Sequence, residues 1–322
     1  MTVIRLDLDA LVQASRLTPE EAARLAGLAL PDNRAGLAAN ILLIFGAVAV
    51  AIATIALVPN AATGLLLAAA ALGGAEALRH FSKGESFALL AIALALMGTL
   101  GLAGWVAWEF EDAPVTAPAL LVTLILSAGA IRYRSAFLAA LSMVALGPVL
   151  GTGTGYWHAS YALFVEEPVL SILIFGALSA GLYRLRRELA PAWQSLATSA
   201  ARTGLILLHF SFWVGSLWGD VIGDAWLPYD SAGDAGRIAP AWFSVGWAAL
   251  SLALALKTRR GGFLSVSALV FLTIHAYTQY FETFGAEPAT LLVAGIALIG
   301  LAIVTAKLTR FGSAKDKVSP AG

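Results

Sequence analysis

Ten apolar stretches divide the chain, and their length limits it to very few folds. Each holds about 17–24 residues, and a helix of that length, rising about 1.5 Å per residue, crosses a hydrocarbon layer of about 30 Å. The stretches are 36–58, 61–79, 86–108, 115–131, 135–151, 167–184, 203–222, 239–256, 262–283 and 288–308. Their Ala- and Leu-rich filling favours helices over strands. We therefore predict an all-α, polytopic transmembrane helix bundle of about ten spans.

The composition agrees with a bundle in lipid. Hydrophobic residues make up 59% of the 322 residues and charged residues 12%, whereas a soluble domain carries about 25% charged residues. The net charge is zero without a basic tract, which excludes a nucleic-acid partner. The absence of cysteine excludes disulfides and thiolate chemistry. The first apolar stretch is too long for a cleavable signal core and is predicted to stay as an anchor.

The basic residues are sorted between the gaps. Nineteen of the twenty Lys and Arg residues lie at the chain ends or in alternate gaps, and only Arg237 breaks the pattern. The positive-inside rule therefore predicts cytoplasmic N- and C-termini. The opposite gaps carry these acidic residues: Glu109, Glu111, Asp112, Glu166, Glu167, Asp220, Asp224, Asp230, Asp234, Glu282 and Glu287. An interfacial aromatic belt is predicted near that outer face, made of Trp105, Trp108, Trp157, Trp218, Trp226 and Trp242.

The chain is predicted to have three parts. They are a cytoplasmic helical arm (1–35), the ten-span bundle (36–308) and a disordered cytoplasmic tail (309–322). In the arm, Thr18 suits a helix N-cap, Pro19 suits the first helical position, and Glu21 completes a capping box. Two interpretations stay open: a hairpin that rests on the bundle, or a docking site for a partner helix.

Two connecting segments have a distinct composition. The glycine- and threonine-rich segment 151–155 and the aromatic residues after it predict a flexible outer loop that leads into an interfacial stretch. The segment 185–201 predicts a short helix on the inner headgroups, because it combines arginines with Leu and Trp.

Small residues and a proline predict how the spans pack and end. Pro148, after Gly147, is expected to end or kink the fifth span. Close backbone packing is predicted at small residues of the third and sixth spans, namely Gly98, Gly101, Gly104, Ala177 and Gly181.

Ionisable residues at membrane depth are candidates for function because they are expensive to bury in lipid. Near the inner end of the second span, Glu76 lies three residues before Arg79. Two interpretations remain: a structural ion pair in which both side chains reach the interface, or a carboxylate that handles protons.

Two spans carry polar residues at helical spacing, so that each set shares one helix face. The sets are His209, Trp213, Ser216 and Asp220 in the seventh span, and His275, Gln279 and Glu282 in the ninth. If these helices are neighbours, the two sets enclose a hydrated crevice. The other interpretation is interhelical hydrogen bonding without a solute, worth about 0.6 kcal/mol per bond. A haem between His209 and His275 is disfavoured by a depth difference of about 10 Å, and no cofactor or metal is predicted.

The arm segment Leu-Thr-Pro-Glu-Glu-Ala-Ala-Arg-Leu, from Leu17 to Leu25, precedes many short Ala- and Leu-rich spans. In this it resembles a bacterial group of predicted polytopic membrane proteins of unknown function. That resemblance implies a multi-pass protein of the bacterial inner membrane and brings no site residues. The span number also resembles ten-helix drug/metabolite-type permeases, from which the long outer loops, the arm and the lack of a five-plus-five repeat depart.

Three functions are compatible with these features. The first is permease-like handling of a small solute or ion along the two polar sets, with histidine protonation as a coupling step. The second is a non-transporting scaffold or sensor that binds a partner through its arm. The third, an intramembrane enzyme, needs a convergent nucleophile and base, and no such constellation stands out in the sequence. The expected partners are the lipid bilayer and an unknown small solute or protein.

Overall fold

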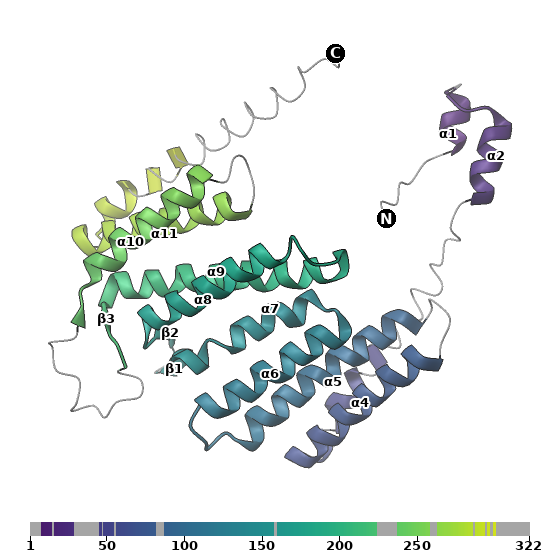
Figure 1. Cartoon of the computed structure of the whole chain (residues 1–322), viewed down its shortest axis with the longest axis horizontal. Coiled ribbons are helices and arrows are strands. Elements are labelled where there is room, and N and C mark those ends of the chain that lie inside the picture. The colour runs from purple at the N-terminus through teal and green to yellow at the C-terminus, as the bar shows by residue number, and fades with distance from the viewer. Residues whose placement is uncertain are drawn as a thin grey trace.

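In the computed structural model, the described residues are mostly helical, and Figure 1 shows long helices with two small pairs of strands. It describes residues 8–14, 16–28, 45–46, 48–54, 56–81, 87–157, 160–223, 237–257, 263–285, 287–293, 295–296 and 299–300. The predicted tail (309–322) and much of the first and tenth predicted spans lie outside these residues.

The secondary structure follows the predicted helix pattern with local exceptions. The helices are α1 (Leu8–Gln13), α2 (Pro19–Leu28), α4 (Ala61–Phe81), α5 (Ala88–Glu109), α6 (Thr116–Tyr133), α7 (Ala136–Ala145), α8 (Pro168–Leu185), α9 (Pro191–Trp218), α10 (Pro240–Lys257) and α11 (Phe263–Phe284), with the 3₁₀ helix η2 (Pro148–Leu150). The strands are β1 (Thr152–Trp157), β2 (Ser160–Val165), β3 (Asp220–Val221) and β4 (Arg237–Ile238). Four of these α-helices and the 3₁₀ helix η2 begin at a proline, whose fixed φ and missing N–H suit the first turn.

Four of the described helices are long and apolar enough to cross a membrane, namely α4, α5, α6 and α8. They correspond to the second, third, fourth and sixth predicted spans. Their lengths of 18 to 22 residues span about 27–33 Å at the α-helical rise. The chain is therefore compatible with a membrane location, and the number of ten spans stays a prediction.

The fifth and seventh predicted spans differ from the helices that form. In place of one helix over 135–151, α7 holds 10 residues and is followed by η2. Pro148 accounts for this, as predicted, because its ring cannot continue the helix. The predicted short helix in 185–201 is the first part of α9, which is a single helix of 28 residues. It ends at Trp218, since Gly219 adopts a left-handed φ of 76°.

The segment after η2 is a β-hairpin, so the predicted flexible loop is wrong. β1 and β2 pair antiparallel, from Thr152 opposite Val165 to Trp157 opposite Ser160. Threonine, tyrosine and tryptophan are enriched in strands, and the loop prediction gave this preference too little weight. β3 and β4 form a second, shorter antiparallel pair.

The helices lie beside one another in a row. Figure 1 shows α4, α5, α6 and α7 in chain order, then α8 with α9, and then α10 with α11. The longest helix, α9, contacts α7, α8, α10 and α11. It also contributes many of the buried residues. Because α9 lies between α7 and α8 on one side and α10 and α11 on the other, its side chains determine how α10 and α11 pack against the rest of the row.

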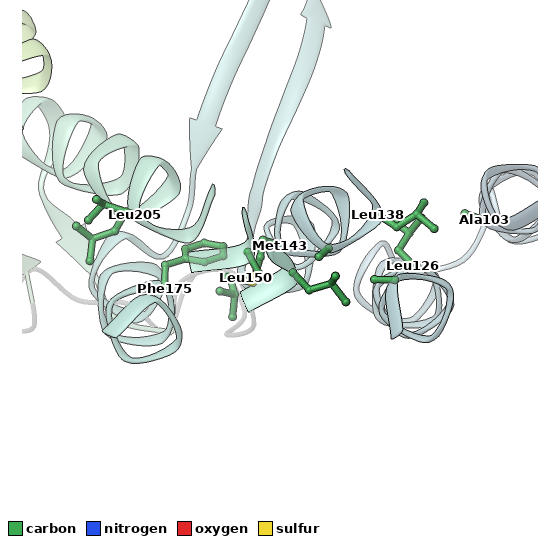
Figure 2. Close-up of a cluster of buried hydrophobic side chains, with 12 residues drawn as sticks. Ala103, Leu126, Leu138, Met143, Leu150, Phe175 and Leu205 are labelled. Atoms are coloured by element: carbon green, nitrogen blue, oxygen red, sulfur yellow. The ribbon is translucent and has the colours of Figure 1, made fainter. Parts of the chain in front are cut away.

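The hydrophobic core follows the same row. Figure 2 shows its labelled members spread from α5 through α6 and α7 to α8 and α9: Ala103, Leu126, Leu138, Met143, Leu150, Phe175 and Leu205. Alanine and glycine let neighbouring helices approach. A Cβ on Gly98 of α5 would lie 2.8 Å from the backbone N of Leu72 and 2.9 Å from the backbone O of Ala68 on α4. The predicted close packing is therefore confirmed at Gly98. It is wrong at two positions where a Cβ would meet no described atom within 4 Å, Gly104 and Gly181.

The helix ends form two chemically different groups. At the first, named the basic end, Arg79 Nη1 donates to the backbone O of Arg132 at 3.4 Å, and the Arg134 guanidinium lies 5.4 Å from the Trp193 ring. These contacts bring together the ends of α4 and α6 and the beginning of α9. At the second, named the acidic end, Glu167 and Asp220 connect α8 with the segment after α9.

Candidate functional site

The contact of α9 with α10 includes one tightly packed glycine from each helix. A Cβ on Gly215 of α9 would lie 2.5 Å from the Phe243 ring of α10. In the reverse direction, a Cβ on Gly246 of α10 would lie 3.3 Å from the Phe212 ring of α9. The two helices therefore approach closely enough for polar side chains farther along this contact to touch.

His209 and Trp247 meet at this contact. Trp247 Nε1–H donates to His209 Nδ1 at 2.9 Å, and both side chains have 0% exposure. The His209 ring also stacks on Phe271 of α11, with centroids 4.6 Å apart and planes 9° apart. Three helices thus meet at one histidine.

The indole hydrogen bond defines the protonation state of His209. An indole N–H is only a donor, so Nδ1 must act as the acceptor. The neutral ring then carries its proton on Nε2. A protonated imidazole has no acceptor nitrogen, so adding a proton to His209 requires separation from Trp247.

His275 lies against the same tryptophan. Its ring centroid is 4.7 Å from that of Trp247. Among the described residues, His209 Nε2, His275 Nδ1 and Ser251 Oγ are buried and have no hydrogen-bond partner. An unpaired buried polar atom costs about 1–3 kcal/mol. The two histidine rings lie against the same indole, and Ser251 is one turn from Trp247 on α10, so three helices each contribute an unpartnered polar atom to this region.

The premise of the predicted crevice is confirmed, because α9 and α11 are neighbours. Trp213 Nε1–H on α9 donates to Thr278 Oγ1 on α11 at 3.1 Å. Ser216 is buried, and its hydroxyl donates to the backbone O of Trp213 at 2.7 Å. Trp213 thus makes the interhelical hydrogen bond of the second interpretation, and Ser216 bonds within its own helix. The two histidines each retain an unpartnered nitrogen.

Asp220 lies outside α9, in β3, and not on the helical face that its spacing predicted. Its Oδ2 accepts a hydrogen bond from Val169 N–H in the first turn of α8 at 2.7 Å. In return, Glu167 before α8 accepts from Gly223 N–H at 2.9 Å. Both carboxylates are buried. A buried carboxylate is stabilised by backbone N–H groups at a helix N-terminus. The two hydrogen bonds, one accepted by Asp220 and one by Glu167, therefore hold the start of α8 against the segment after α9.

Arg237, the exception to the basic pattern, lies at the same acidic end. Its Nη2 donates to the backbone O of Trp218, the last residue of α9, at 3.0 Å. Basic side chains commonly satisfy the final carbonyls of a helix. A capping role therefore accounts for an arginine on this side.

The other two residues of the predicted polar set in the ninth span, Gln279 and Glu282, lie on α11. Gln279 is half-buried one turn after His275, and its backbone O accepts from Thr283 Oγ1 at 2.8 Å. Glu282 lies in the last turn of α11, and its side chain is outside the described residues.

The predicted pair Glu76 and Arg79 belongs to a larger group at the basic end. Arg79 Nη1 lies 4.0 Å from Glu76 Oε1, while Arg132 Nη2 donates to Glu76 Oε2 at closer range. The guanidinium carbons of Arg79 and Arg132 lie 5.4 Å and 5.8 Å from the centroid of the Tyr133 ring. Two cations around one half-exposed carboxylate favour the ion-pair interpretation.

Sequence reasoning missed the residues that join the two histidines. Trp247, Ser251 and Phe271 were not singled out. A signal was present: Ser251 is one turn from Trp247, and Phe271 is one turn from His275. Such spacing places each pair on one helix face. Arg132 was missed as a partner because 56 residues separate it from Glu76.

Comparison with protein-family models, with curated proteins and with solved structures finds no match to this chain. Among the described residues, no group of three His, Cys, Asp or Glu side chains has the geometry of a metal site.

Proposed function

We propose that this chain is a ten-span protein of a bacterial inner membrane, with both termini cytoplasmic, and that it handles a small polar solute or ion in a permease-like way. Four membrane-length apolar helices support the membrane part. Large exposed apolar side chains on these helices also support it, including Leu66, Ile92, Leu124 and Leu173, because such side chains are favourable against lipid and unfavourable against water. The sorting of basic residues supports the orientation.

The observation that carries the permease-like role is the histidine pair around Trp247. His209 Nε2–H is a donor, Ser251 Oγ can donate or accept, and His275 Nδ1 can do either according to its tautomer. A small species that offers both a donor and an acceptor would satisfy these atoms. Because the site is buried at the contact of three helices, the solute would enter only when α10 or α11 moves relative to α9.

Proton coupling would use the two histidines differently. Protonation of His209 breaks the bond to Trp247 and so loosens the contact of α9 with α10. His275 has no such bond at Nδ1, so it can take up a proton without that rupture. We expect His275 to be the proton carrier and His209 to hold the closed arrangement.

The test is flux through purified protein in liposomes that contain a pH-sensitive dye. Amino acids, short carboxylic acids and alkali cations are added outside, one at a time. We expect at least one class to change the internal pH with the native chain, and His275→Ala to abolish the change. His80→Ala is the matched control, because His80 is an exposed histidine at the basic end. Unchanged flux in His275→Ala would remove that residue from the mechanism.

A scaffold or sensor is the second candidate, and the arm favours it. α1 and α2 pack on each other, and α2 is started by a reciprocal capping box: Thr18 N–H donates to Glu21 Oε2 at 2.9 Å, and Glu21 N–H donates to Thr18 Oγ1 at 3.2 Å. A preformed hairpin suits the binding of a partner. Deletion of residues 1–34 distinguishes the two functions, since a scaffold loses its partner in a pull-down whereas a permease keeps its flux.

A further inference from the structure

A cavity of about 360 Å³ opens between α4, α5 and the end of α6 at the basic end. Its wall on α5 is formed by Ala88, Ala91, Ile92 and Ala95, which recur at the spacing of one helix face. Its mouth is polar and is lined by Arg79, Tyr133 and Ser135. The cavity therefore has an apolar half along α5 and a cationic, hydrogen-bonding half at the helix ends.

The charge at the mouth is not balanced within the described residues. Arg79 and Arg132 share one carboxylate, Glu76, and the close ion pair belongs to Arg132. Arg79 makes longer contacts, 4.0 Å to Glu76 and 3.4 Å to a carbonyl oxygen, and its guanidinium carbon lies 5.4 Å from the centroid of the Tyr133 ring. A guanidinium has five N–H donors, so Arg79 keeps donors for an anionic group at the mouth.

We propose that this cavity binds an anionic phospholipid, with its phosphate at Arg79 and Tyr133 and part of an acyl chain along α5. The position fits, because the polar half lies at the helix ends, where headgroups lie, and the apolar half extends toward the membrane interior. Basic pockets between transmembrane helices are known to hold such headgroups. A free inorganic anion would leave the apolar wall unused. This site is separate from the histidine pair and does not depend on the proposed transport.

The test is native mass spectrometry of the full chain, after incubation with equal amounts of phosphatidylglycerol and phosphatidylcholine. We expect the native chain to retain phosphatidylglycerol in preference. Arg79→Gln should reduce the retained phosphatidylglycerol by about fivefold, the factor that one basic residue contributes at an anionic surface. Ala88→Trp should reduce retention of both lipids, because Ala88 is exposed and a tryptophan there fills the cavity without disturbing the core.

Arg202→Gln is the matched control. Arg202 lies 5.0 Å from the Phe263 ring and outside the cavity, so its loss should leave retention unchanged. Equal retention of both lipids by the native chain would overturn the proposal. An equal loss of phosphatidylglycerol in Arg202→Gln and Arg79→Gln would also overturn it, because it would indicate a general attraction between basic residues and anionic lipid. Displacement of the lipid by inorganic phosphate would point to a free-anion site and would also overturn it. A matched thermal transition for each variant confirms that the fold is intact.

Discussion

Trp247 of α10 holds His209 of α9 as a neutral ring by donating its indole N–H to Nδ1, and neither side chain is accessible to solvent. Removing one partner of a fully buried hydrogen bond leaves the other polar atom unsatisfied, which destabilises the folded state. This bond therefore specifies the register of α9 against α10 as well as contributing to stability.

Trp247→Phe should lower the free energy of unfolding by about 1–3 kcal/mol, because it leaves His209 Nδ1 buried without a donor. The smaller ring also leaves a cavity, which adds to the loss. Trp242→Phe is the control, since Trp242 is 72% exposed at the start of the same helix. Denaturant unfolding in detergent measures both variants. An equal effect of the two would show that the hydrogen bond contributes nothing measurable.

The same bond predicts the tautomer of His209. In ¹⁵N-histidine NMR of the full chain, which has four histidines, we expect one ring to be neutral with its proton on Nε2. That signal should disappear in His209→Gln and change in Trp247→Phe. A proton on Nδ1 of this ring would contradict the direction of the hydrogen bond.

Two glycines on α5 should respond oppositely to the same substitution. Gly98→Ala places a Cβ against the α4 backbone, and overpacking of this kind typically destabilises by about 1–3 kcal/mol. Gly104→Ala meets open space and should stabilise by up to about 1 kcal/mol, because alanine favours a helix over glycine. The thermal transitions of the two variants measure the difference. A stabilising Gly98→Ala would show that α4 and α5 are farther apart than described.

The arm should lose order in acid through Glu21. Hydrogen bonds from the N–H and hydroxyl of Thr18 lower the pKa of Glu21 below its ordinary value of 4.5. A carboxyl with a lowered pKa stabilises the folded state above the unfolded value, and this stabilisation is lost as the pH falls through the folded pKa. Hydrogen exchange of α2, normalised to intrinsic rates, should show less protection at pH 3 than at pH 6.

Glu21→Ala, which removes the acceptor of the capping box, should have reduced protection already at pH 6. Glu20→Ala, its neighbour on the same turn, should behave as the native chain. If Glu20→Ala had the same effect, the helix dipole and not the capping box would be responsible.

Asp220→Ala should destabilise the acidic end by about 0.5–2 kcal/mol, the usual effect of removing a helix N-cap. Asp220→Asn keeps an acceptor oxygen for Val169 N–H and should lose less. Asp112→Asn changes an exposed acidic residue in the connection between α5 and α6 and should leave the stability unchanged. Unfolding midpoints in detergent provide the comparison, and an effect of Asp112→Asn as large as that of Asp220→Ala would argue for overall charge instead.

Local features of the sequence predicted the helices well, because apolar length and proline positions are local signals. Four membrane-length helices, the break at Pro148 and the capping box at Thr18 are confirmed. The β-hairpin at 152–165 was missed because glycines obscured its alternating β-favouring residues. The division of 185–222 into two helices was wrong because a change of polarity was taken for a helix end.

Contacts between distant segments could not be predicted in the same way. The neighbourhood of His209 and His275 was stated as an assumption, and its central residue is Trp247, which lies on a third helix. Asp220 matched the helical spacing of α9, but the left-handed turn at Gly219 directs the chain back toward α8. Helical spacing assigns a face only while the helix continues.

The hydrogen bond between Asp220 and the first turn of α8 has a consequence for when α8 can reach its final packing during synthesis. The carboxylate that completes its first turn belongs to a residue translated 51 positions after Val169, so the ribosome makes all of α9 before that attachment is available. We therefore expect α8 and α9 to leave the insertion machinery together, as one antiparallel unit.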